Sequence, residues 1–292
     1  YAKEMGFSVL KFGGSSVADA TCMSRVLDIA GAMAREGRVV VVSSAISGCT
    51  DALLACAEGD TSGAAALQER HERIVHRLFT GAEREGCLKE VSRLFEEMLS
   101  APDEEKVTFG ELLSTRILAR KFQCEGVGTL WVDSRETVVK DNLPETFRRI
   151  RAAVSASEAR VVVAPGFICS DSLGRVSTLG RGGSDYSAAL YAAALDAEAL
   201  QIWTDVPGIM TANPRQVPAA RTVPAMSYRS ALAMAEHGAK VLYAPTVAPA
   251  MEAGIDIEIR NTFAPEGKRT IISAAPDPQP WVGLASTGGE IC

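Results

Sequence analysis

Short apolar runs that alternate with helical segments constrain the fold of this chain more than any other feature of the sequence. Val39–Val42 and Val161–Ala164 are short and dominated by valine, so they are predicted to be buried strands. Ser8–Phe12 is a third strand candidate. The strands that begin at Ser8 and Val39 each run into a loop of small residues and then into a helix. Such β–loop–α units are typical of a parallel sheet with helices on its faces.

The same patterns assign elements to the rest of the chain. Residues 62–124 are predicted to form three helices with no strand between them, which would make a helical lobe over the sheet. From Asn261 the chain is predicted to be polar and irregular, with a proline-rich linker over Ala274–Pro280. The other expected elements are strands at 129–132, 160–165, 199–203 and 256–259, a hairpin of 167–170 with 175–178, and helices at 144–157, 184–195, 227–239 and 246–253.

Composition and charge exclude several classes of protein. The chain has 292 residues, of which 47% are hydrophobic and 23% are charged, which is ordinary globular composition with enough length for a full core. Its 30 Lys and Arg against 36 Asp and Glu give a net charge of −6, which argues against a nucleic-acid-coating surface. A basic pocket for a small anion remains compatible with that charge, because a pocket is local and net charge is global.

The sequence carries no sign of a targeting segment, a membrane span or a metal motif. No apolar run reaches the ~18 residues of a span, and residues 1–8 have no secretory signal. The seven cysteines are odd in number and include no CxxC pair, which predicts free thiols, a cytoplasmic location and no structural zinc site. His71 and His76 lie on a charged helix and are expected to be solvated.

The loop after the first strand has the composition of an anion-binding turn. In open parallel sheets, ligands bind at the carboxyl ends of the strands. This strand ends in Lys11-Phe12-Gly13-Gly14-Ser15-Ser16. The glycines let the backbone approach a phosphate, and the following helix offers free N–H groups. Lys11 adds a positive charge, although no Walker motif GxxxxGK[ST] occurs. A plain Gly-Gly turn is the alternative.

Three further loops lie at expected strand ends. Ser43–Thr50 offers hydroxyls for a carboxylate or a phosphate, although a polar helix cap explains the same residues. Thr178–Asp185 places three glycines between a strand and a helix, and this density favours a functional loop. In it, Arg181 can fork onto a carboxylate, and Asp185 can orient a lysine or meet a metal. Thr204–Gly208 leaves a buried strand, and a plain connector explains it equally well.

Taken together, these loops resemble one family, the aspartokinases. The resemblance rests on motifs that occur in the family's order, from about residue 9 to about residue 273. The most specific is TLGRGGSDY at 178–186. The others are KFGGSS at 11–16, VSSA to TD at 42–51, FGE at 109–111, WTDVPG at 203–208 and GAKVL at 238–242. The stretches 216–228 and 260–263 are most similar to the kinase half of bifunctional aspartokinase–homoserine dehydrogenases.

The resemblance implies the amino-acid-kinase fold, a three-layer α/β/α sandwich around a mainly parallel sheet. It also implies transfer of the γ-phosphoryl group of ATP, with Mg²⁺, to the side-chain carboxylate of L-aspartate. The product, 4-phospho-L-aspartate, begins lysine, threonine, methionine and isoleucine synthesis. The physical argument agrees, because a carboxylate with a pKa near ~3.9 is already ionised at neutral pH and needs no general base. Phosphoryl transfer requires positioning and charge neutralisation, for which Lys11, Arg181 and Lys240 are the available cations.

The match to the family also implies roles on the phosphate side. Lys11 is expected to contact the transferring phosphoryl group, and Asp185 to orient Lys11 or the metal environment. No side-chain metal site is implied, because Mg²⁺ is carried by ATP. The implied nucleotide-binding residues are Lys11, Gly13, Gly14, Ser15, Thr204, Asp205, Met210, Arg215 and Lys240.

On the substrate side, Glu111 is expected to hold the amino group and Arg181 the α-carboxylate. Ser44 and Thr50 are expected on the remaining acidic group. The sequence departs from the family pattern only on the nucleotide side. The departures are Met210 where a tyrosine is common, Asn213 where an aspartate is common, and Tyr243-Ala244-Pro245 where the family has HP after VL.

The expected domain organisation is one catalytic unit and a linker. Residues 1–273 are predicted to form an aspartokinase catalytic domain, with the helical lobe at about 62–124. Residues 274–292 are predicted to lead toward regulatory ACT domains that family members carry and this sequence lacks. The chain is therefore interpreted as part of a longer protein, and a naturally short, unregulated form is the alternative. L-aspartate and ATP are the implied partners, with no nucleic acid or membrane, and the full-length protein is implied to be a homo-oligomer.

Two other functional hypotheses remain open at this point. A different amino-acid kinase that acts on a carboxylate, such as glutamate 5-kinase or acetylglutamate kinase, would share much of the pattern. A degenerate domain could also bind nucleotide or aspartate as a sensor without turnover, and the altered nucleotide-side residues motivate that hypothesis.

Overall fold

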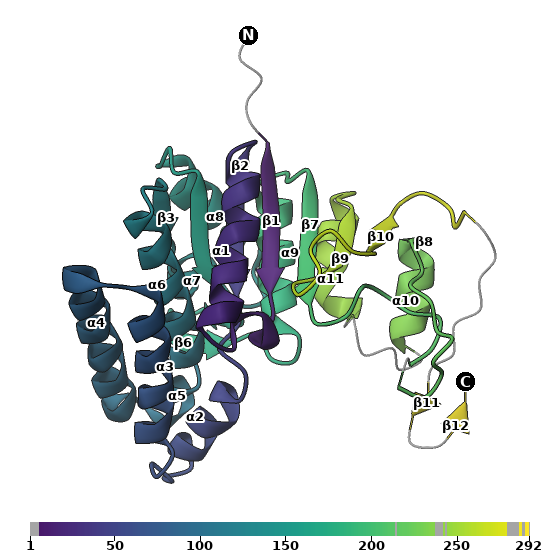
Figure 1. The fold of residues 1–292 in the computed structure, drawn as a ribbon. Helices are drawn as coiled ribbons and strands as arrows, with labels where there is room; N and C mark the ends of the chain where they lie inside the picture. Colours follow the sequence, from purple (N-terminus) through teal and green to yellow (C-terminus); the bar gives the residue numbers. More distant parts are fainter. Residues whose placement is uncertain are drawn as a thin grey trace.

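The structure is a computed structural model that describes residues 6–213, 215–236, 242, 244–278, 286–287 and 290–291. Its centre is an eight-stranded sheet in the order β3-β4-β2-β1-β7-β9-β10-β8 (Figure 1). The strands from β3 to β9 in this order are parallel, and β10 is antiparallel to β9. The bounds are β1 Phe7–Phe12, β2 Arg38–Ser43, β3 Thr129–Trp131, β4 Val161–Pro165, β7 Ala199–Thr204, β8 Ala225–Ser227, β9 Ile257–Asn261 and β10 Thr270–Ser273.

Helices cover both faces of the sheet, which confirms the predicted α/β/α architecture (Figure 1). On one face α1 and α6 contact β2 and β4, and α3 and α4 pack against these helices. On the other face α9 contacts β1, β2 and β7, with α8 and α11 beside it. The longer helices are α1 Ala20–Ala34, α2 Cys49–Ala57, α3 Ala64–Leu78, α4 Gly81–Ser100, α6 Phe109–Cys124, α8 Leu143–Ser155, α9 Gly183–Ala194, α10 Tyr228–Glu236 and α11 Ala244–Glu252. Short turns of helix are η1 Gly14–Val17, α5 Asp103–Lys106 and α7 Ser134–Thr137.

The central strands are apolar on both faces because helices cover both. Val40 in β2 lies between Val9 of β1 and Val162 of β4 in the parallel register. Val39 and Val41 belong to the core on one face of the sheet, whereas Val40 and its alternate neighbours belong to the core on the other. A continuous valine run is what a parallel strand buried on both faces requires.

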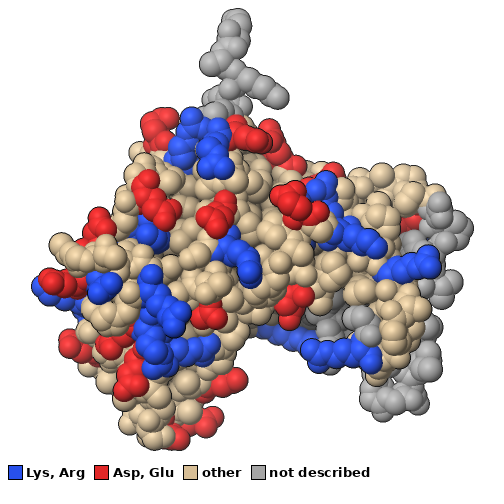
Figure 2. Space-filling model, in the orientation of Figure 1, with Lys and Arg blue, Asp and Glu red and all other residues tan. Residues whose placement is uncertain are grey.

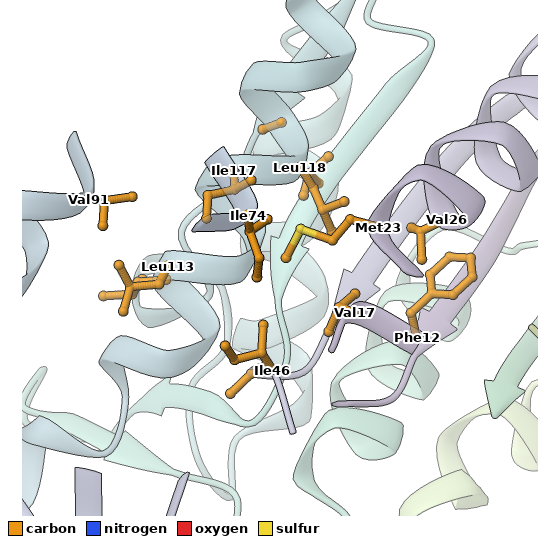
Figure 3. Close-up of a cluster of buried hydrophobic side chains, with 14 of the residues drawn as sticks. Phe12, Val17, Met23, Val26, Ile46, Ile74, Val91, Leu113, Ile117 and Leu118 are labelled. Carbon is orange, nitrogen blue, oxygen red and sulfur yellow. The ribbon is translucent and has the colours of Figure 1, made fainter. Parts of the chain in front are cut away.

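One core joins the helices of residues 64–124 to the sheet. Figure 3 shows Phe12 of β1 and Met23 of α1 in the same cluster as Ile74 of α3 and Leu113 of α6. Val91 extends the cluster to α4. The helical segment therefore shares its apolar contacts with the sheet instead of enclosing a separate core.

The prediction that the chain becomes irregular after Asn261 is wrong. Residues 270–273 form β10, which pairs with β9 and with β8, a second strand that the sequence did not predict. The Thr270 hydroxyl accepts a hydrogen bond from the Ile209 amide at 2.8 Å and donates to the Val223 carbonyl at 2.7 Å. These strands are short and are held by residues far away in the sequence, so no local sequence pattern predicts them.

His71 is fully buried, so the expectation that it is solvated is wrong, whereas His76 is exposed as expected. Position 71 falls on the inner stripe of α3 with Leu67 and Ile74. Its Nδ1 lies 2.8 Å from the Leu67 carbonyl oxygen, and its ring packs edge-on against Phe95. Burial lowers the pKa of His71 to about 4.

The described part of the chain contains no helix that is both long and apolar enough to cross a membrane. Its six cysteines are free thiols, and all but Cys124 are buried. Burial raises the pKa of each of these thiols, which keeps them in the unreactive protonated form. Cys292 lies outside the described residues.

Candidate functional site

Three of the predicted loops lie side by side at the carboxyl edge of the sheet. β2, β1 and β7 are parallel neighbours, so their carboxyl ends meet. The Ser44 amide donates to the Phe12 carbonyl at 3.0 Å, and the Gly13 amide donates to the Trp203 carbonyl at 3.3 Å. We call residues 13–16 the glycine loop and residues 43–50 the serine loop. Backbone hydrogen bonds thus fix the glycine loop between the serine loop and the end of β7.

The loop Thr178–Asp185 reaches the same edge from outside the large sheet. It leaves the hairpin of β5 (Ile168–Ser170) and β6 (Val176–Thr178), which follows β4 and confirms the hairpin predicted from the sequence. Gly180 and Gly182 adopt left-handed backbone angles, with φ of 74° and 69°, which glycine tolerates without strain. These turns lead into α9, which packs beneath β1 and brings its first turn to the site.

A cavity of about 370 Å³ lies where these loops meet. Residues of the glycine loop, the serine loop, the loop before α9 and the first turn of α6 all line it. Six residues that the sequence assigned to the site are on its wall, namely Lys11, Gly14, Ser44, Thr50, Glu111 and Asp185. Its volume is within the range of small-molecule binding sites.

Lys11 and Asp185 form an ion pair on the wall of this cavity. The Lys11 Nζ lies 2.7 Å from the Asp185 Oδ1, and the two side chains are 13% and 15% exposed. Lys11 is the penultimate residue of β1, and Asp185 lies in the first turn of α9. A carboxylate at this distance holds the ammonium group in place while leaving it other N–H donors. Lys11 is therefore a positioned cation that can still reach an anionic ligand.

Glu111 is a buried carboxyl on the same wall, at 4% exposure. Its Oε1 accepts a hydrogen bond from the Ala45 amide at 3.2 Å, and its Oε2 has no partner within the described residues. Burial raises the pKa of Glu111 to about 8. A buried carboxyl oxygen without a donor is costly. A ligand that brings a positively charged donor into the cavity would satisfy it.

Gly110 explains how Glu111 comes so close to the serine loop. A Cβ added at Gly110 would lie 2.7 Å from the Ala45 Cβ and 3.1 Å from the Cys49 Sγ. Only glycine lets the first turn of α6 pack this tightly against the serine loop and the start of α2. The FGE motif is thus a packing device as well as a source of one carboxylate.

None of the other predicted residues that the structure describes is on the wall of this cavity. Arg181 is exposed in the loop whose glycines line the cavity. Gly13 and Ser15 belong to the glycine loop beside Lys11. The nucleotide-side residues Thr204, Asp205, Met210 and Arg215 lie at and beyond the end of β7. Lys240, like Tyr243, lies outside the described residues.

Sequence reasoning missed two features of the site. Phe167 lines the cavity in a left-handed conformation with φ of 68°, which is rare for a bulky residue. The Ser187 hydroxyl accepts from its amide at 3.0 Å and so helps to hold it there. Ser16 is fully buried and its hydroxyl lies 2.6 Å from that of Thr262, which ties the glycine loop to the end of β9. Gly166 was the only sign in the sequence of the unusual turn at Phe167, and no sequence pattern indicated the contact of Ser16 with Thr262.

The cavity wall therefore favours negative charge on a ligand at one point and positive charge at another. Lys11 and the glycine-loop backbone favour an anion, whereas the unpartnered Glu111 oxygen favours a cationic donor. Among the residues that the structure describes, no group of three or more His, Cys, Asp or Glu could hold a metal ion. A divalent ion at this site would thus need most of its oxygen ligands from the bound molecule.

These features define a class: an α/β/α protein with a cavity lined by charged groups at the carboxyl edge of its parallel strands, where ligands bind in such sheets. The chain belongs to the amino acid kinase family, whose family model matches residues 6–261.

Individual relatives in this family are aspartokinases. The chain is 35% identical over 289 residues to lysine-sensitive aspartokinase 3 of Escherichia coli, covering 90% of this chain and 63% of that protein. It is 31% identical to the bifunctional aspartokinase/homoserine dehydrogenase of Haemophilus influenzae, covering 90% of this chain and 36% of that protein. The crystal structure of E. coli aspartokinase III with aspartate and ADP superposes with a TM-score of 0.83 at 33% identity, over 96% of this chain and 67% of that one. The chain thus spans less than two thirds of the length of these two sequence relatives.

Proposed function

We propose that this chain is an aspartokinase catalytic domain, which transfers the γ-phosphoryl group of ATP to the side-chain carboxylate of L-aspartate. The product would be 4-phospho-L-aspartate, the first intermediate of the aspartate-family amino acids. The observation that carries the proposal is the single cavity that holds both the Lys11–Asp185 pair and the unpartnered carboxyl of Glu111. The named relatives, which align with about 90% of this chain, support the same activity.

The substrate end of the cavity suits an α-amino acid with an acidic side chain. Glu111 Oε2 would accept from the substrate ammonium group, which pairs two charges that are each costly to bury alone. The hydroxyls of Ser44 and Thr50 would donate to a substrate carboxylate. Arg181 would fork onto the α-carboxylate from the loop whose glycines line the cavity.

At the phosphoryl end, the chemistry is mainly charge neutralisation. The acceptor carboxylate is ionised at neutral pH, so no base has to remove a proton before attack. Attack brings two anions together, and Lys11 would stabilise the charge on the transferring group while Asp185 holds its ammonium group in place. The Gly14 amide would provide a neutral donor. The Gly13 amide, which the sequence also assigned to this role, instead donates to the Trp203 carbonyl. Mg²⁺ would arrive on the nucleotide phosphates and screen their charge.

The nucleotide would lie toward the end of β7. The Gly13 amide bonds to the Trp203 carbonyl, so Thr204 and Asp205 follow directly beside the glycine loop. In this proposal Met210, Arg215 and Lys240 belong to the same nucleotide side. Residues 1–273 would form the kinase unit, and residues 274–292 a linker outside it.

An ADP-release assay with competing acceptors tests the proposal. The chain is assayed with Mg·ATP and L-aspartate, L-glutamate or N-acetyl-L-glutamate at matched concentrations. We expect kcat/KM to be highest for aspartate, because the serine loop and Glu111 enclose a short acidic amino acid. Best turnover on glutamate or acetylglutamate would overturn the substrate assignment. Binding of Mg·ATP without turnover on any acceptor would favour the nucleotide-sensor hypothesis instead.

A further inference from the structure

A second cavity of about 380 Å³ lies outside the proposed active site, between α3 and the segment that enters α1. Arg70, Arg73 and Arg77 of α3 line one side of it, and residues 18–21 line the other. Figure 2 shows basic side chains gathered on this face of the molecule, where α3 passes the beginning of α1 in Figure 1. This cavity is as large as the first one, and nothing in the proposed kinase mechanism uses it.

The spacing of the three arginines along α3 brings their positive charges to one side of the second cavity. Positions 70, 73 and 77 are three and four residues apart, so they share one face of α3 with the buried Ile74 between them. Three guanidinium groups offer planar, paired N–H donors, a geometry that fits phosphate and carboxylate oxygens.

The acidic groups nearby do not neutralise this cluster. Asp19 is the acidic residue on the cavity wall, and its Oδ1 already accepts from the Cys22 amide at 2.8 Å as the N-cap of α1. That hydrogen bond, together with the charge of Arg77, keeps the pKa of Asp19 below its usual range, so the Asp19 carboxylate offsets only one of the three arginine charges. Glu69 approaches Arg73 only at 3.7 Å, with both side chains about two-thirds exposed, and such pairs contribute little. The wall therefore keeps an excess of positive charge in a chain whose net charge is −6.

Arg70 connects this cavity to the proposed active site. Its guanidinium donates to the Ser47 carbonyl of the serine loop and, at 3.2 Å, to the Ala18 carbonyl that follows the glycine loop. The same loops are joined by the Ser47 amide, which donates to the Gly14 carbonyl at 3.2 Å. Arg70 thus lies on the wall of one cavity while it clamps two loops of the other.

We propose that this second cavity is a binding site for a small oxyanion, a phosphate- or carboxylate-bearing molecule held by Arg70, Arg73 and Arg77. Arg70 uses two of its five N–H groups on the loops, so three remain for the bound anion. The ligand would thereby strengthen the clamp between the serine loop and the glycine loop.

Protection of arginines from chemical modification tests the site directly. The wild-type chain is treated with phenylglyoxal, with and without pyrophosphate or citrate, and modification of each arginine is followed by mass spectrometry. We expect at least one anion to slow modification of Arg73 and Arg77 by fivefold or more, with Arg93 of α4 unchanged as the internal control. Protection by pyrophosphate alone assigns a phosphate ligand, and protection by citrate alone assigns a carboxylate ligand. Equal rates with and without both anions would overturn the proposal.

An affinity measurement on variants gives an independent check. Calorimetry of the protecting anion is compared for wild type, the double variant Arg73→Gln/Arg77→Gln and the matched variant Arg93→Gln. The double variant should weaken the site at least tenfold, and Arg93→Gln should leave it within twofold. Unchanged binding in the double variant would contradict the assignment even if protection is observed. These measurements need neither ATP nor an acceptor, so their outcome is separate from that of the proposed kinase activity.

Discussion

At the scale of single residues, Glu111 couples burial to ligand binding. Burial raises the pKa of Glu111 to about 8, so the free chain at neutral pH holds this group mostly protonated. An ammonium donor on Oε2 favours the ionised form, so binding below pH 8 must release a proton. We expect the KM for aspartate to fall as the pH rises from about 6 to about 8, and then to level off.

Glu111→Gln should remove this slope and raise the KM for aspartate about tenfold or more, because the charge on the accepting oxygen is lost. Steady-state kinetics from pH 6 to 9 on wild type and variant measure both effects. Glu125→Gln, an exposed glutamate at the end of α6, is the matched control and should behave as wild type. If Glu111→Gln keeps the wild-type dependence of KM on pH, Glu111 does not bind the substrate amino group.

Lys11 makes a different prediction, because its charge is proposed to matter for transfer more than for binding. Lys11→Met should lower kcat by about 10²–10³-fold, the usual cost of losing a positioned donor on developing charge. Lys89→Met, on the exposed side of α4, is the control and should keep wild-type kcat. Initial rates at saturating aspartate and ATP distinguish the two. Near-normal kcat in Lys11→Met would exclude its proposed role.

At the scale of elements, two glycines in helices allow the effect of tight packing on stability to be measured separately from the effect of helix propensity. Gly110 lies in the first turn of α6 against the serine loop, where an added Cβ would lie 2.7 Å from the Ala45 Cβ. Gly31 lies inside α1, where an added Cβ meets nothing within 4 Å. Gly31→Ala should raise the free energy of unfolding by about 0.5–1 kcal/mol. Gly110→Ala should lower it by about 1–3 kcal/mol through overpacking. Denaturant unfolding tests both, and equal signs would contradict the packing account.

The contact between α3 and α4 makes stability depend on pH through His71. Its pKa is about 4 in the folded chain and near ~6.5 when unfolded, so the unfolded chain binds the extra proton first. The stabilisation is complete above pH 6.5 and is lost as the pH falls toward 4, at a cost of roughly 3 kcal/mol. His71→Leu should therefore flatten the fall in Tm over this range. His76→Leu, at an exposed site on the same helix, should retain it; parallel curves for wild type and His71→Leu would refute the assignment.

The same elements show what the sequence could and could not predict. The valine runs of β2 and β4 were predictable because burial on both faces leaves a continuous apolar pattern. β10 was not, because its four residues, which lie between β9 and the edge strand β8, are held through the Thr270 hydroxyl by distant carbonyl and amide groups. His71 was wrongly predicted to be solvated because the prediction rested on its polar side chain. The helical spacing from Leu67 and Ile74 places it on the buried face of α3. The motif residues were found by resemblance, whereas the cavity that joins Lys11 to Glu111 required the fold.

At the scale of the whole molecule, charge is distributed locally. Figure 2 shows acidic and basic side chains interspersed over much of the visible face, in keeping with a net charge of −6 and no broad basic surface on that face. Among the described residues, the cations on the cavity walls are Lys11 in the first cavity and Arg70, Arg73 and Arg77 in the second. A site that joins two anions needs local positive charge, and the surrounding protein can stay acidic without opposing it.

Trapping of the acyl phosphate tests the central claim most directly. The chain is incubated with Mg·ATP, L-aspartate and hydroxylamine, which converts an aspartyl phosphate into a stable hydroxamate. We predict that aspartate hydroxamate accumulates in step with ADP and that Lys11→Met reduces both together. If calorimetry shows that Mg·ATP binds and yet no hydroxamate forms from aspartate, the chain is a binding domain and the catalytic account is contradicted.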